Sequence, residues 1–398
     1  MNIIENKKRV AIIGEGTAGC ISASIFNFYF PDTEIIWYNS PKLLAQSVGE
    51  GSALGLPFTL RTALDMGYED FKKVKGTFKN GIRKINWGQY NQDFMHDFPL
   101  GQNGLHFSAD ELQAHIKEKL NKNVSIKKQH IENYDKLDCD YILDCSGKPS
   151  NYDDYHIAPS IPVNSAYIVQ CKWDKPQFDY TLTIARPYGW IFGIPLENRC
   201  SIGYLYNQEI NKIEDIKNDL NEVLIEYGFK PSTEPRTYSF NSYYKKTNFT
   251  ERVTYNGNSS FFLEPLEATS IGIIQKNAYK ALDIFYKGYN LKEANKYYQN
   301  HIKEVYFMIM VHYLAGSKFS TPFWENAYKK AQNFISSQSP KNFNEVYNLS
   351  KEYLKNNRVR LIEEQKHHNN LSFGTWSIES WNMNLINLDL YNKLDKLI

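Results

Sequence analysis

Apolar residues near the start of the chain form two short continuous runs separated by a helical pattern. Arg9–Gly14 is the first run and predicts a buried strand, and Glu34–Tyr38 is the second. Between them, Thr17–Phe30 has the spacing of a helix packed directly after the first strand. A strand, a helix and another buried strand make a βαβ unit, so this opening predicts a parallel sheet.

The hydrophobic pattern changes further along the chain. Helical spacing predicts a helix over Ala109–Leu120 with Ser108 as its N-cap, and Tyr141–Cys145 is another buried strand. Alternating runs rich in β-branched and aromatic residues then predict an antiparallel layer over Ala166–Trp173, Tyr180–Ala185 and Cys200–Tyr206. After Ile271 the pattern is mostly helical to about His368, with Leu291–Leu314 and Phe343–Gln365 as the longest candidates. We therefore expect an α/β protein whose core, inserted β layer and helical C-terminal region share one body.

Composition and charge exclude several classes of protein. Of 398 residues, 42% are hydrophobic and 23% are charged, which excludes a disordered or collagen-like chain. Lysine and arginine number 46 against 44 acidic residues, a net charge of +2, so no nucleic-acid partner is expected. No apolar run is long enough to cross a bilayer, and five cysteines without a C-x-x-C spacing indicate free thiols. We expect a cytoplasmic protein with no membrane partner. The aromatic content of 15% leaves core filling, a ligand pocket and composition bias open.

The first predicted strand leads into a glycine fingerprint. Gly14, Gly16 and Gly19 form the pattern G-x-G-x-x-G between the strand and the helix, which is typical of dinucleotide binding. The first glycine permits the tight turn, the second lets the backbone approach a pyrophosphate, and the third allows close packing of the helix. Thr17 and Ala18 lie at the helix N-terminus, whose free N–H groups bind phosphate.

The end of the second predicted strand departs from this fingerprint. An acidic residue is expected about 20 residues after the glycines to accept the ribose hydroxyls. Asn39, followed by Ser40, occupies that place. An amide still hydrogen-bonds a hydroxyl, but without the assistance of a charge. Asp144–Gly147, at the end of a buried strand, is a second candidate cofactor segment, and an ordinary strand ending is the alternative for it.

Several segments occur in the order found in one enzyme family. They are Gly14–Gly19, Ser47–Ser52 (similar to V-G-E-A-T), Gly76–Ile82 (similar to A-T-F-K-x-G-I), Gly189–Pro195, Phe262–Ile271, and Val311–Tyr313 with Pro322–Trp324 (similar to L-H-Y and P-F-W). Together they run from about residue 9 to about residue 330. On these motifs the chain resembles the flavin-dependent tryptophan halogenase family.

The resemblance implies a reaction and two catalytic residues. In this family, FAD reduced by a separate flavin reductase reacts with oxygen and halide, and the hypohalous acid formed travels inside the protein to a lysine. Lys79 matches that lysine, and Glu267 matches the glutamate that assists electrophilic substitution on a small aromatic substrate, here expected to be of indole type. Glu264 is the structural alternative to Glu267. Without the motif, Lys79 would count as one of a solvated group with Lys72, Lys73, Lys75 and Lys84.

The resemblance also implies residues around the flavin, the halide and the substrate. Pro265 is expected to cap or begin a helix, so that Thr269 and Ser270 bind the halide near its N-terminus. The cofactor-binding residues implied are Gly14, Gly16, Thr17, Ala18, Gly19, Asn39, Ser40, Ser47, Val48, Gly49, Trp190 and Ile271. His96 and His106 border the substrate side, with a purely structural role as the alternative for each. No histidine spacing indicates a metal site, and none is expected.

Two departures from the family pattern leave other functions open. Phe192 stands where the motif W-x-W-x-I-P has its second tryptophan, and Ala268 and Ser270 replace Ser and Gly in F-x-x-P-x-x-S-x-G. These changes favour, as the alternative, a flavin monooxygenase that hydroxylates an aromatic substrate. A second alternative is a non-catalytic flavin-binding protein. It is suggested by Asn39 and by the short C-terminal region.

We expect two interlocked modules. Residues 1–285 would form the FAD-binding, Rossmann-like module with the inserted antiparallel β layer at about 160–245, and residues 286–398 a helical substrate module packed on it. The part beyond about residue 330, including Phe373–Trp376 and Trp381, has no assigned role. The choice between chloride and bromide, the identity of the substrate and a homodimeric assembly stay open.

Overall fold

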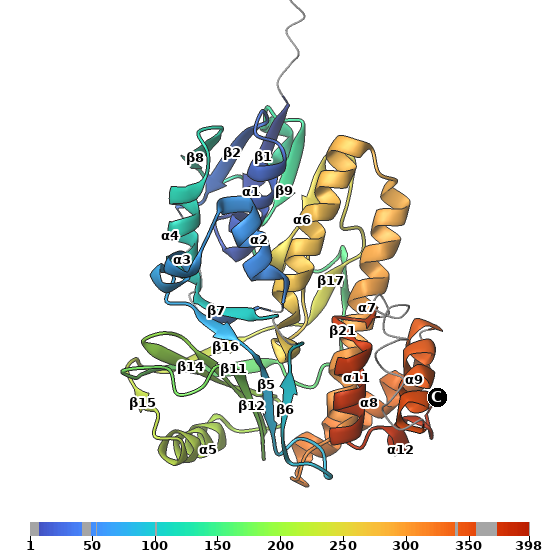
Figure 1. Cartoon of the computed structure of the whole chain (residues 1–398). Coiled ribbons are helices and arrows are strands. Elements are labelled where there is room, and N and C mark those ends of the chain that lie inside the picture. Colours follow the sequence, from blue (N-terminus) through green and yellow to red (C-terminus); the bar gives the residue numbers. More distant parts are fainter. Residues whose placement is uncertain are drawn as a thin grey trace, which may run out of the picture.

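Two large β-sheets, joined by long helices, form the frame of the protein (Figure 1). The computed structural model describes residues 8–41, 49–52, 54–99, 102–338, 341–355 and 372–397. The predicted α/β class, with a parallel sheet, an antiparallel layer and a helical C-terminal region, is confirmed.

The first large sheet has five parallel strands in the order β18-β9-β1-β2-β8. Its strands are β1 (Arg9–Ile13), β2 (Glu34–Asn39), β8 (Val124–Lys128), β9 (Tyr141–Asp144) and β18 (Val253–Tyr255). Helix α1 (Thr17–Tyr29) connects β1 to β2. The βαβ opening predicted from the hydrophobic pattern is therefore confirmed, because short apolar runs with helical spacing between them have few other solutions.

The second large sheet is mostly antiparallel and has eight strands. They are β5 (Gly81–Ile85), β6 (Asp93–Asp97), β11 (Ser165–Lys172), β12 (Thr181–Arg186), β13 (Gly189–Pro195), β14 (Arg199–Tyr206), β15 (Lys230–Pro231) and β16 (Arg236–Ser239). The predicted antiparallel layer is confirmed. The sheet also includes β5 and β6 from early in the chain, and β5 pairs with β12 in parallel.

Three small sheets complete the strand arrangement. They are β3-β7-β4, made of Gly49–Gly51, Gly104–Ser108 and Thr77–Lys79; β10-β17-β19, made of Tyr155–Ile157, Tyr243–Lys245 and Phe261–Phe262; and β20-β21, made of Ser372–Phe373 and Trp376–Ser377. One residue, Asn80, separates β4 from β5, and its backbone N–H donates to the carbonyl of Asp179 at 2.8 Å. The chain therefore crosses from one sheet to another between Lys79 and Gly81.

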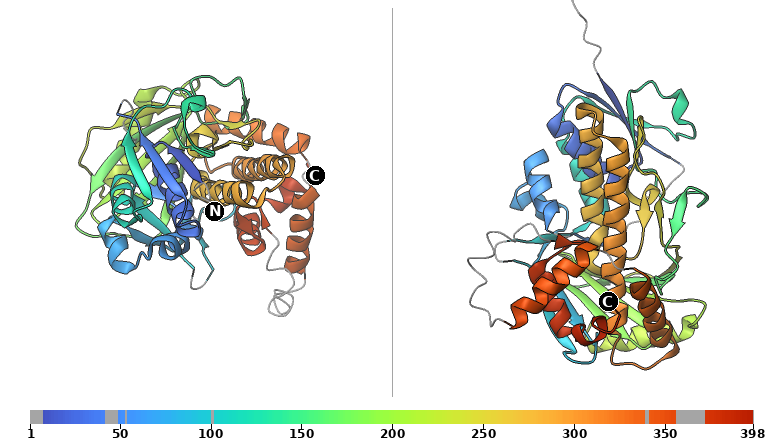
Figure 2. Two further views of the ribbon diagram at one scale, coloured as in Figure 1. Left: turned by 90° about the horizontal axis from the view of Figure 1, so that it is seen from above. Right: turned by 90° about the vertical axis from the view of Figure 1, so that its right-hand side faces the viewer.

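Two long helices, α6 (Thr269–Lys287) and α7 (Leu291–Ala315), run side by side along the molecule (Figure 2). The turn between them follows from local chemistry. Gly288 ends α6 with a φ of +64°, which favours glycine, and the Asn290 side chain caps α7 by accepting the N–H groups of Lys292 and Glu293. This hairpin holds the first turn of α6 and the last turns of α7 in one fixed relation.

Shorter helices cover the sheets and build the C-terminal part. They are α2 (Gly55–Leu64), α3 (Tyr68–Lys73), α4 (Ala109–Lys119), α5 (Ile213–Glu226), α8 (Pro322–Ser337), α9 (Lys341–Lys355), α11 (Ile378–Asn387) and α12 (Tyr391–Leu394), with 3₁₀ turns at Tyr134–Lys136, Gly257–Ser259 and Leu266–Ala268. The helix predicted over Phe343–Gln365 corresponds to α9, and residues 356–371 lie outside the described part.

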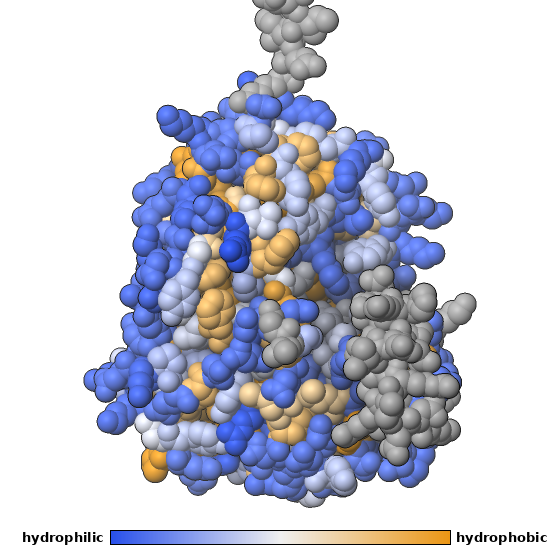
Figure 3. Space-filling model, viewed as in Figure 1, coloured by the Kyte–Doolittle hydropathy of each residue, from blue (hydrophilic) through white to orange (hydrophobic). Residues whose placement is uncertain are grey.

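A continuous apolar core connects the N-terminal and C-terminal elements. It extends from Val10 on β1 to Leu394 on α12 and includes most of the inward side of α7. The face shown in Figure 3 is mainly hydrophilic, interrupted by small apolar patches. Among the described residues no helix is long and apolar enough to cross a membrane.

Candidate active site

The glycine fingerprint forms a tight turn between β1 and α1. Gly14 has a φ of +104°, and a Cβ atom there would lie 2.1 Å from the carbonyl oxygen of Cys145. A Cβ atom on Gly19 would lie 2.1 Å from the carbonyl oxygen of Gly14. Both positions therefore require glycine, which is the reason that the helix can start so close to the strand.

The surroundings of Gly16 and Asn39 fit a bound dinucleotide. Among the described residues, nothing occupies the space where a Cβ atom of Gly16 would stand, and no side chain caps α1. The first-turn N–H groups of α1 are thus available to a phosphate. Asn39 ends β2 with its Oδ1 atom buried and without a hydrogen-bond partner among the described residues. A ribose hydroxyl is the kind of donor that such an oxygen requires.

Thr17 connects the fingerprint to a second family motif. Its hydroxyl donates to Oε1 of Glu50 at 2.7 Å, and burial raises the pKa of Glu50 to about 7. Sequence reasoning did not assign a role to Glu50. Gly49 belongs to β3, where it pairs with Ser108, and Ser40 contacts the Nδ1 atom of His130 at 3.0 Å. Ser47 and Val48, predicted to bind the cofactor, lie outside the described residues.

Lys79 is fully buried, and none of the described residues is a polar partner for it. Its side chain is 0% exposed, and among the described residues its Nζ atom makes no hydrogen bond. The ring centroid of Phe98 lies 5.4 Å from Nζ. Burial lowers the pKa of Lys79 to about 8, with the Glu267 carboxylate opposing the shift and Lys84 adding to it. With this pKa, roughly one tenth of the amine is uncharged at pH 7 and about half at pH 8, far more than for an ordinary lysine.

Glu267 lies in an unusual backbone conformation just before α6. Its φ is +66°, and that of Ala268 is +53°, so both occupy the left-handed region, which is strained for residues with a Cβ atom. The conformation turns the Glu267 side chain inward and lets α6 begin at Thr269. Pro265 precedes this turn, as the N-cap of the 3₁₀ segment Leu266–Ala268.

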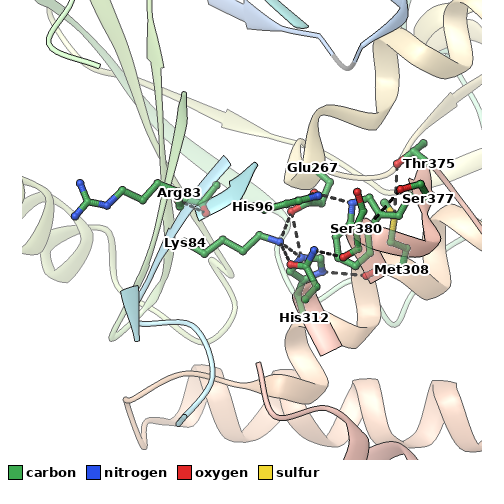
Figure 4. A network of polar contacts seen from close by, with 12 residues as sticks. Arg83, Lys84, His96, Glu267, Met308, His312, Thr375, Ser377 and Ser380 are labelled. Atoms are coloured by element: carbon green, nitrogen blue, oxygen red, sulfur yellow. Dashed lines mark hydrogen bonds and ion pairs between the residues drawn. The ribbon is translucent and has the colours of Figure 1, made fainter. Parts of the chain in front are cut away.

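The Glu267 carboxylate is surrounded by side-chain nitrogen atoms (Figure 4). Oε1 lies 2.7 Å from Nζ of Lys84 and 3.2 Å from Nε2 of His312, and Oε2 accepts the indole N–H of Trp376 at 2.9 Å. Nδ1 of His96 lies 3.5 Å from Oε2. Burial alone would raise the pKa of Glu267, but Lys84 and the neighbouring imidazoles hold it well below its usual value. Glu267 is thus a buried carboxylate with its charge compensated.

Glu264, the alternative carboxyl, differs in its surroundings. Its Oε2 atom accepts a hydrogen bond from the hydroxyl of Tyr313 at 2.8 Å, and Tyr313 in turn accepts the indole N–H of Trp190 at 3.1 Å. Burial raises the pKa of Glu264 to about 8, so this carboxyl is mainly protonated at neutral pH. The two glutamates therefore carry different charges although they are three residues apart.

The two predicted substrate-side histidines have different surroundings. His106 contacts threonine hydroxyls through both ring nitrogens, Thr181 at 2.9 Å and Thr77 at 3.2 Å, which ties it into the strand framework. His96 has neither ring nitrogen in a hydrogen bond among the described residues, and its ring meets that of Trp376 edge-on at 5.4 Å. Of these two histidines, His96 is the one that faces Glu267.

The helix start at α6 suits a small anion. Thr269 and Ser270 are the first residues of α6, and Ala268 at the N-cap has no side chain that could accept the free N–H groups. Ile271, in the same turn, is buried. The first-turn N–H groups therefore remain available, as a halide requires.

Sequence reasoning missed four residues of the Glu267 environment. Lys84 was grouped with solvated lysines, and Trp376, His312 and Asn384 had no role assigned. One signal was present in the sequence. Ile82 and Lys84 are two residues apart on one strand, so both side chains lie on the same, inward face. The other three come from α7 and the C-terminal segment, far away in sequence. Among the described residues no group of acidic, histidine or cysteine side chains could hold a metal ion.

Comparisons with known proteins identify the family. The family model described as tryptophan halogenase matches residues 9–131 and 102–385, and the chain belongs to this family. The resemblance predicted from the motifs is confirmed. The family consists of enzymes that use reduced FAD and a halide ion.

Individual relatives are distant in sequence. The chain is similar to tryptophan 7-halogenase RebH of Lentzea aerocolonigenes, with 23% identity over 247 residues, 58% of this chain and 46% of that protein. It is 26% identical to tryptophan 6-halogenase SttH of Streptomyces toxytricini over 189 residues, 43% of this chain and 34% of that protein. The aligned stretches thus span less than half of these curated relatives.

Solved structures show the same fold over nearly the whole chain. Xcc4156, a flavin-dependent halogenase from Xanthomonas campestris, has a TM-score of 0.78 at 18% identity, covering 96% of this chain and 89% of that one. BrvH, a flavin-dependent halogenase from Brevundimonas sp. BAL3, has a TM-score of 0.74 at 19% identity, covering 98% and 93%. At such low identity these likenesses establish the fold and leave the substrate to be found.

Proposed function

We propose that the protein is a flavin-dependent halogenase acting on an electron-rich aromatic substrate of indole type. One observation carries the proposal: a fully buried, unpartnered lysine and a buried, ionised glutamate occur on the two matching family motifs. A lysine buried without a polar partner destabilises a fold, so its presence indicates a chemical role. The tryptophan halogenases among its relatives support the substrate class.

The flavin would be held at the first parallel sheet. It would be contacted by Gly16, the N-terminus of α1 and Oδ1 of Asn39. We also assign Trp190 and Ile271 to the binding of this cofactor. When bound, reduced FAD supplies hypohalous acid from oxygen and halide. A separate flavin reductase would be the partner that reduces the FAD. Thr269 and Ser270 would hold the halide at the start of α6.

Lys79 and Glu267 would divide the substitution step between them. The uncharged Lys79 amine hydrogen-bonds hypohalous acid and directs its halogen towards the substrate ring. A bond forms between the halogen and a ring carbon, the ring C–H bond breaks, and the released proton and the hydroxide half of the acid leave as water. Because its pKa is low, Glu267 acts mainly by stabilising the positive charge on the ring.

The module boundaries at residue 285 and the cellular location belong to the same proposal. Residues 286–398 would line the substrate, which is supported by Trp376 and His312 reaching Glu267 from α7 and the C-terminal segment. A cytoplasmic location would match the five free cysteines and the supply of reduced flavin.

Product analysis tests this function. We would supply reduced FAD, oxygen, bromide and an indole-rich library, and search by mass spectrometry for bromine isotope doublets. Lys79→Ala is expected to abolish halogenated product while FAD binding and hydrogen peroxide release persist. Unchanged halogenation by this variant would refute the role of Lys79.

A flavin monooxygenase remains the second candidate because Phe192 replaces a tryptophan of the family motif. Phe192 is buried beside Trp190, with ring centroids 6.4 Å apart, and lacks the indole N–H. In the same assay, incorporation of oxygen from O₂ with no dependence on halide would favour the hydroxylase.

A further inference from the structure

Lys84 is a second fully buried lysine beside the site. It lies on β5, five residues after Lys79, and its side chain is 0% exposed. Figure 4 shows Lys84 pointing into the network around Glu267, whereas the neighbouring Arg83 points the opposite way. Arg83 pairs with Asp93 at the surface, at 2.8 Å. Two adjacent cations on one strand thus have different surroundings.

The Lys84 ammonium has three acceptors. Nζ lies 2.7 Å from Oε1 of Glu267, 3.0 Å from Nε2 of His312 and 2.5 Å from Oδ1 of Asn384. A protonated lysine has three N–H donors, so each donor has one acceptor. An uncharged amine has only two donors, and one acceptor would then face its lone pair.

The orientation of these acceptors is determined by their other bonds. Nδ1 of His312 contacts the carbonyl oxygen of Met308 at 2.9 Å, so it carries the hydrogen and leaves the lone pair of Nε2 towards Lys84. The Nδ2 group of Asn384 donates to the carbonyl oxygen of Ser380 at 2.8 Å, which turns Oδ1 towards Lys84. The network is therefore built around a positive charge on Lys84.

Lys79 shows the opposite arrangement. It is equally buried, yet among the described residues no oxygen or ring nitrogen accepts from its Nζ atom. Of the two lysines, Lys84 is the one that forms the ion pair with Glu267 among the described residues.

Resting on the proposed halogenase function, we propose that Lys84 is a positioning residue for the reaction. Its ammonium is the cationic partner of Glu267, which allows Glu267 to be a carboxylate while Lys79 loses its proton. The reaction needs both states at the same time, because a protonated Lys79 could not accept and direct the halogen.

The charge balance of the site explains why a second lysine is needed. With Lys84 protonated, Glu267 ionised and Lys79 uncharged, the buried site is neutral. The reactive combination is an ionised Glu267 with an uncharged Lys79. Without the charge of Lys84, this combination would bury one negative charge without a partner, which is strongly unfavourable. The site would instead hold one more proton, either on Lys79 or on Glu267. In both cases the reactive combination forms only at higher pH.

The other groups that face these lysines are accounted for. Lys79 is close enough to Glu267, Lys84, His96 and His106 to interact with their charges. Lys84 is faced by Glu267, His312 and His96, and by the ring of Trp376, whose centroid lies 4.9 Å from Nζ. Burial lowers the pKa of each of these three histidines, so they are uncharged at neutral pH. Burial also lowers the pKa of Lys84, but the adjacent Glu267 carboxylate opposes that shift, and Lys84 is the resident cation.

The pH dependence of halogenation tests the proposal. We would measure halogenated product per oxygen consumed between about pH 6 and pH 10 for Lys84→Gln, which keeps a hydrogen-bond donor without the charge. At pH 7 the product is expected to fall by about tenfold or more and to recover as the pH rises, since one pKa unit corresponds to a factor of about ten. Arg83→Gln, on the same strand but outside the network, is the matched control and should keep the wild-type profile.

A measurement without turnover separates this proposal from the halogenase function. Lysine labelled with ¹³C at Cε and glutamate labelled at Cδ report the protonation of Lys79 and Glu267 by NMR, with signals assigned through Lys79→Met and Glu267→Gln. In Lys84→Gln, one of the two groups should hold an additional proton at about pH 9, where most of the wild-type Lys79 is uncharged. If neither does, or if activity falls equally at all pH values, Lys84 is a packing residue and the proposal is wrong. If the proton appears but the wild type halogenates nothing, the charge assignment stands and the halogenase function fails. Lys84→Met, with FAD binding as a check of folding, repeats the test without any hydrogen bond.

Discussion

The indole N–H of Trp376 donates to Oε2 of Glu267 at 2.9 Å, so that the last part of the chain directly contacts the glutamate before α6. The two residues are 109 positions apart in sequence. Trp376 lies on β21, and its ring also meets those of His96 and His312 edge-on, at 5.4 and 5.2 Å. The C-terminal segment therefore forms part of the site.

We expect Trp376→Phe to impair halogenation without loss of the flavin. The variant keeps an aromatic ring but removes one donor to a buried carboxylate, and a hydrogen bond to a charged group contributes about 1.5–3 kcal/mol. Product formation should fall by about tenfold or more, with unchanged FAD affinity in a fluorescence titration. Trp381→Phe is the control, because its indole N–H donates to the carbonyl of Phe373 and not to Glu267. Equal losses in the two variants would show that Trp376 contributes only packing.

Lys79→Met should make the protein more stable although it removes the amine that we propose to be catalytic. Burial of a protonated amine without a partner disfavours the folded state. The drop in the Lys79 pKa from 10.5 to about 8 corresponds to a loss of at most about 3 kcal/mol in the free energy of unfolding. Chemical denaturation at pH 7 should show a free energy of unfolding higher by about 1–3 kcal/mol.

The same substitution has a predictable pH dependence. The folded-state pKa of Lys79 is lowered, so the unfolded chain binds more protons between about pH 8 and pH 10.5, and wild-type stability gains in that window. The advantage of Lys79→Met should therefore shrink from pH 8 upwards. Lys72→Met, at a half-exposed lysine, should change stability by less than about 0.5 kcal/mol. A destabilised Lys79→Met would contradict the assignment of Lys79 as unpartnered.

Glu264→Gln and Glu267→Gln should have contrasting effects. Burial raises the pKa of Glu264 to about 8, so the folded state holds its proton and loses stability as the pH rises from 4.5 towards 8. Glu264→Gln imitates the protonated form and should flatten that pH dependence, as measured by denaturation at several pH values. Glu267→Gln removes a charge that pairs with Lys84 and should reduce halogenation by about a hundredfold. A Glu264→Gln variant as inactive as Glu267→Gln would contradict this division of roles.

Asn39→Asp should strengthen FAD binding. A carboxylate accepts hydrogen bonds from ribose hydroxyls with the assistance of its charge, whereas Oδ1 of Asn39 is a buried, unpartnered amide oxygen among the described residues. We expect a several-fold lower dissociation constant for FAD in a fluorescence titration, and a higher one for Asn39→Ala. Neither variant should alter the binding of FMN, which lacks the adenosine ribose, and an equal effect on FMN would place Asn39 elsewhere.

Much of the frame could be predicted because it depends on local patterns. The β1–α1–β2 opening agrees with the predicted ranges to within one residue, since apolar runs and glycines determine backbone conformation over short distances. The start of α6 at Thr269 likewise agrees with the helix start expected after Pro265. The motif around Lys79 was recognisable for the same reason.

The sequence by itself therefore determined the parallel nucleotide-binding sheet, the antiparallel layer, the helical C-terminal region and the positions of Lys79 and Glu267. Only the tertiary structure decided the charge of each group. Lys79 and Lys84 are five residues apart, and Glu264 and Glu267 three, yet the members of each pair differ. Lys84 has an ionic partner where Lys79 has none among the described residues, and Glu267 is ionised where Glu264 is mainly protonated. The physical reason is that protonation in a buried site depends on neighbours contributed by β21, α7 and α11, and no local pattern indicates which distant side chains will meet.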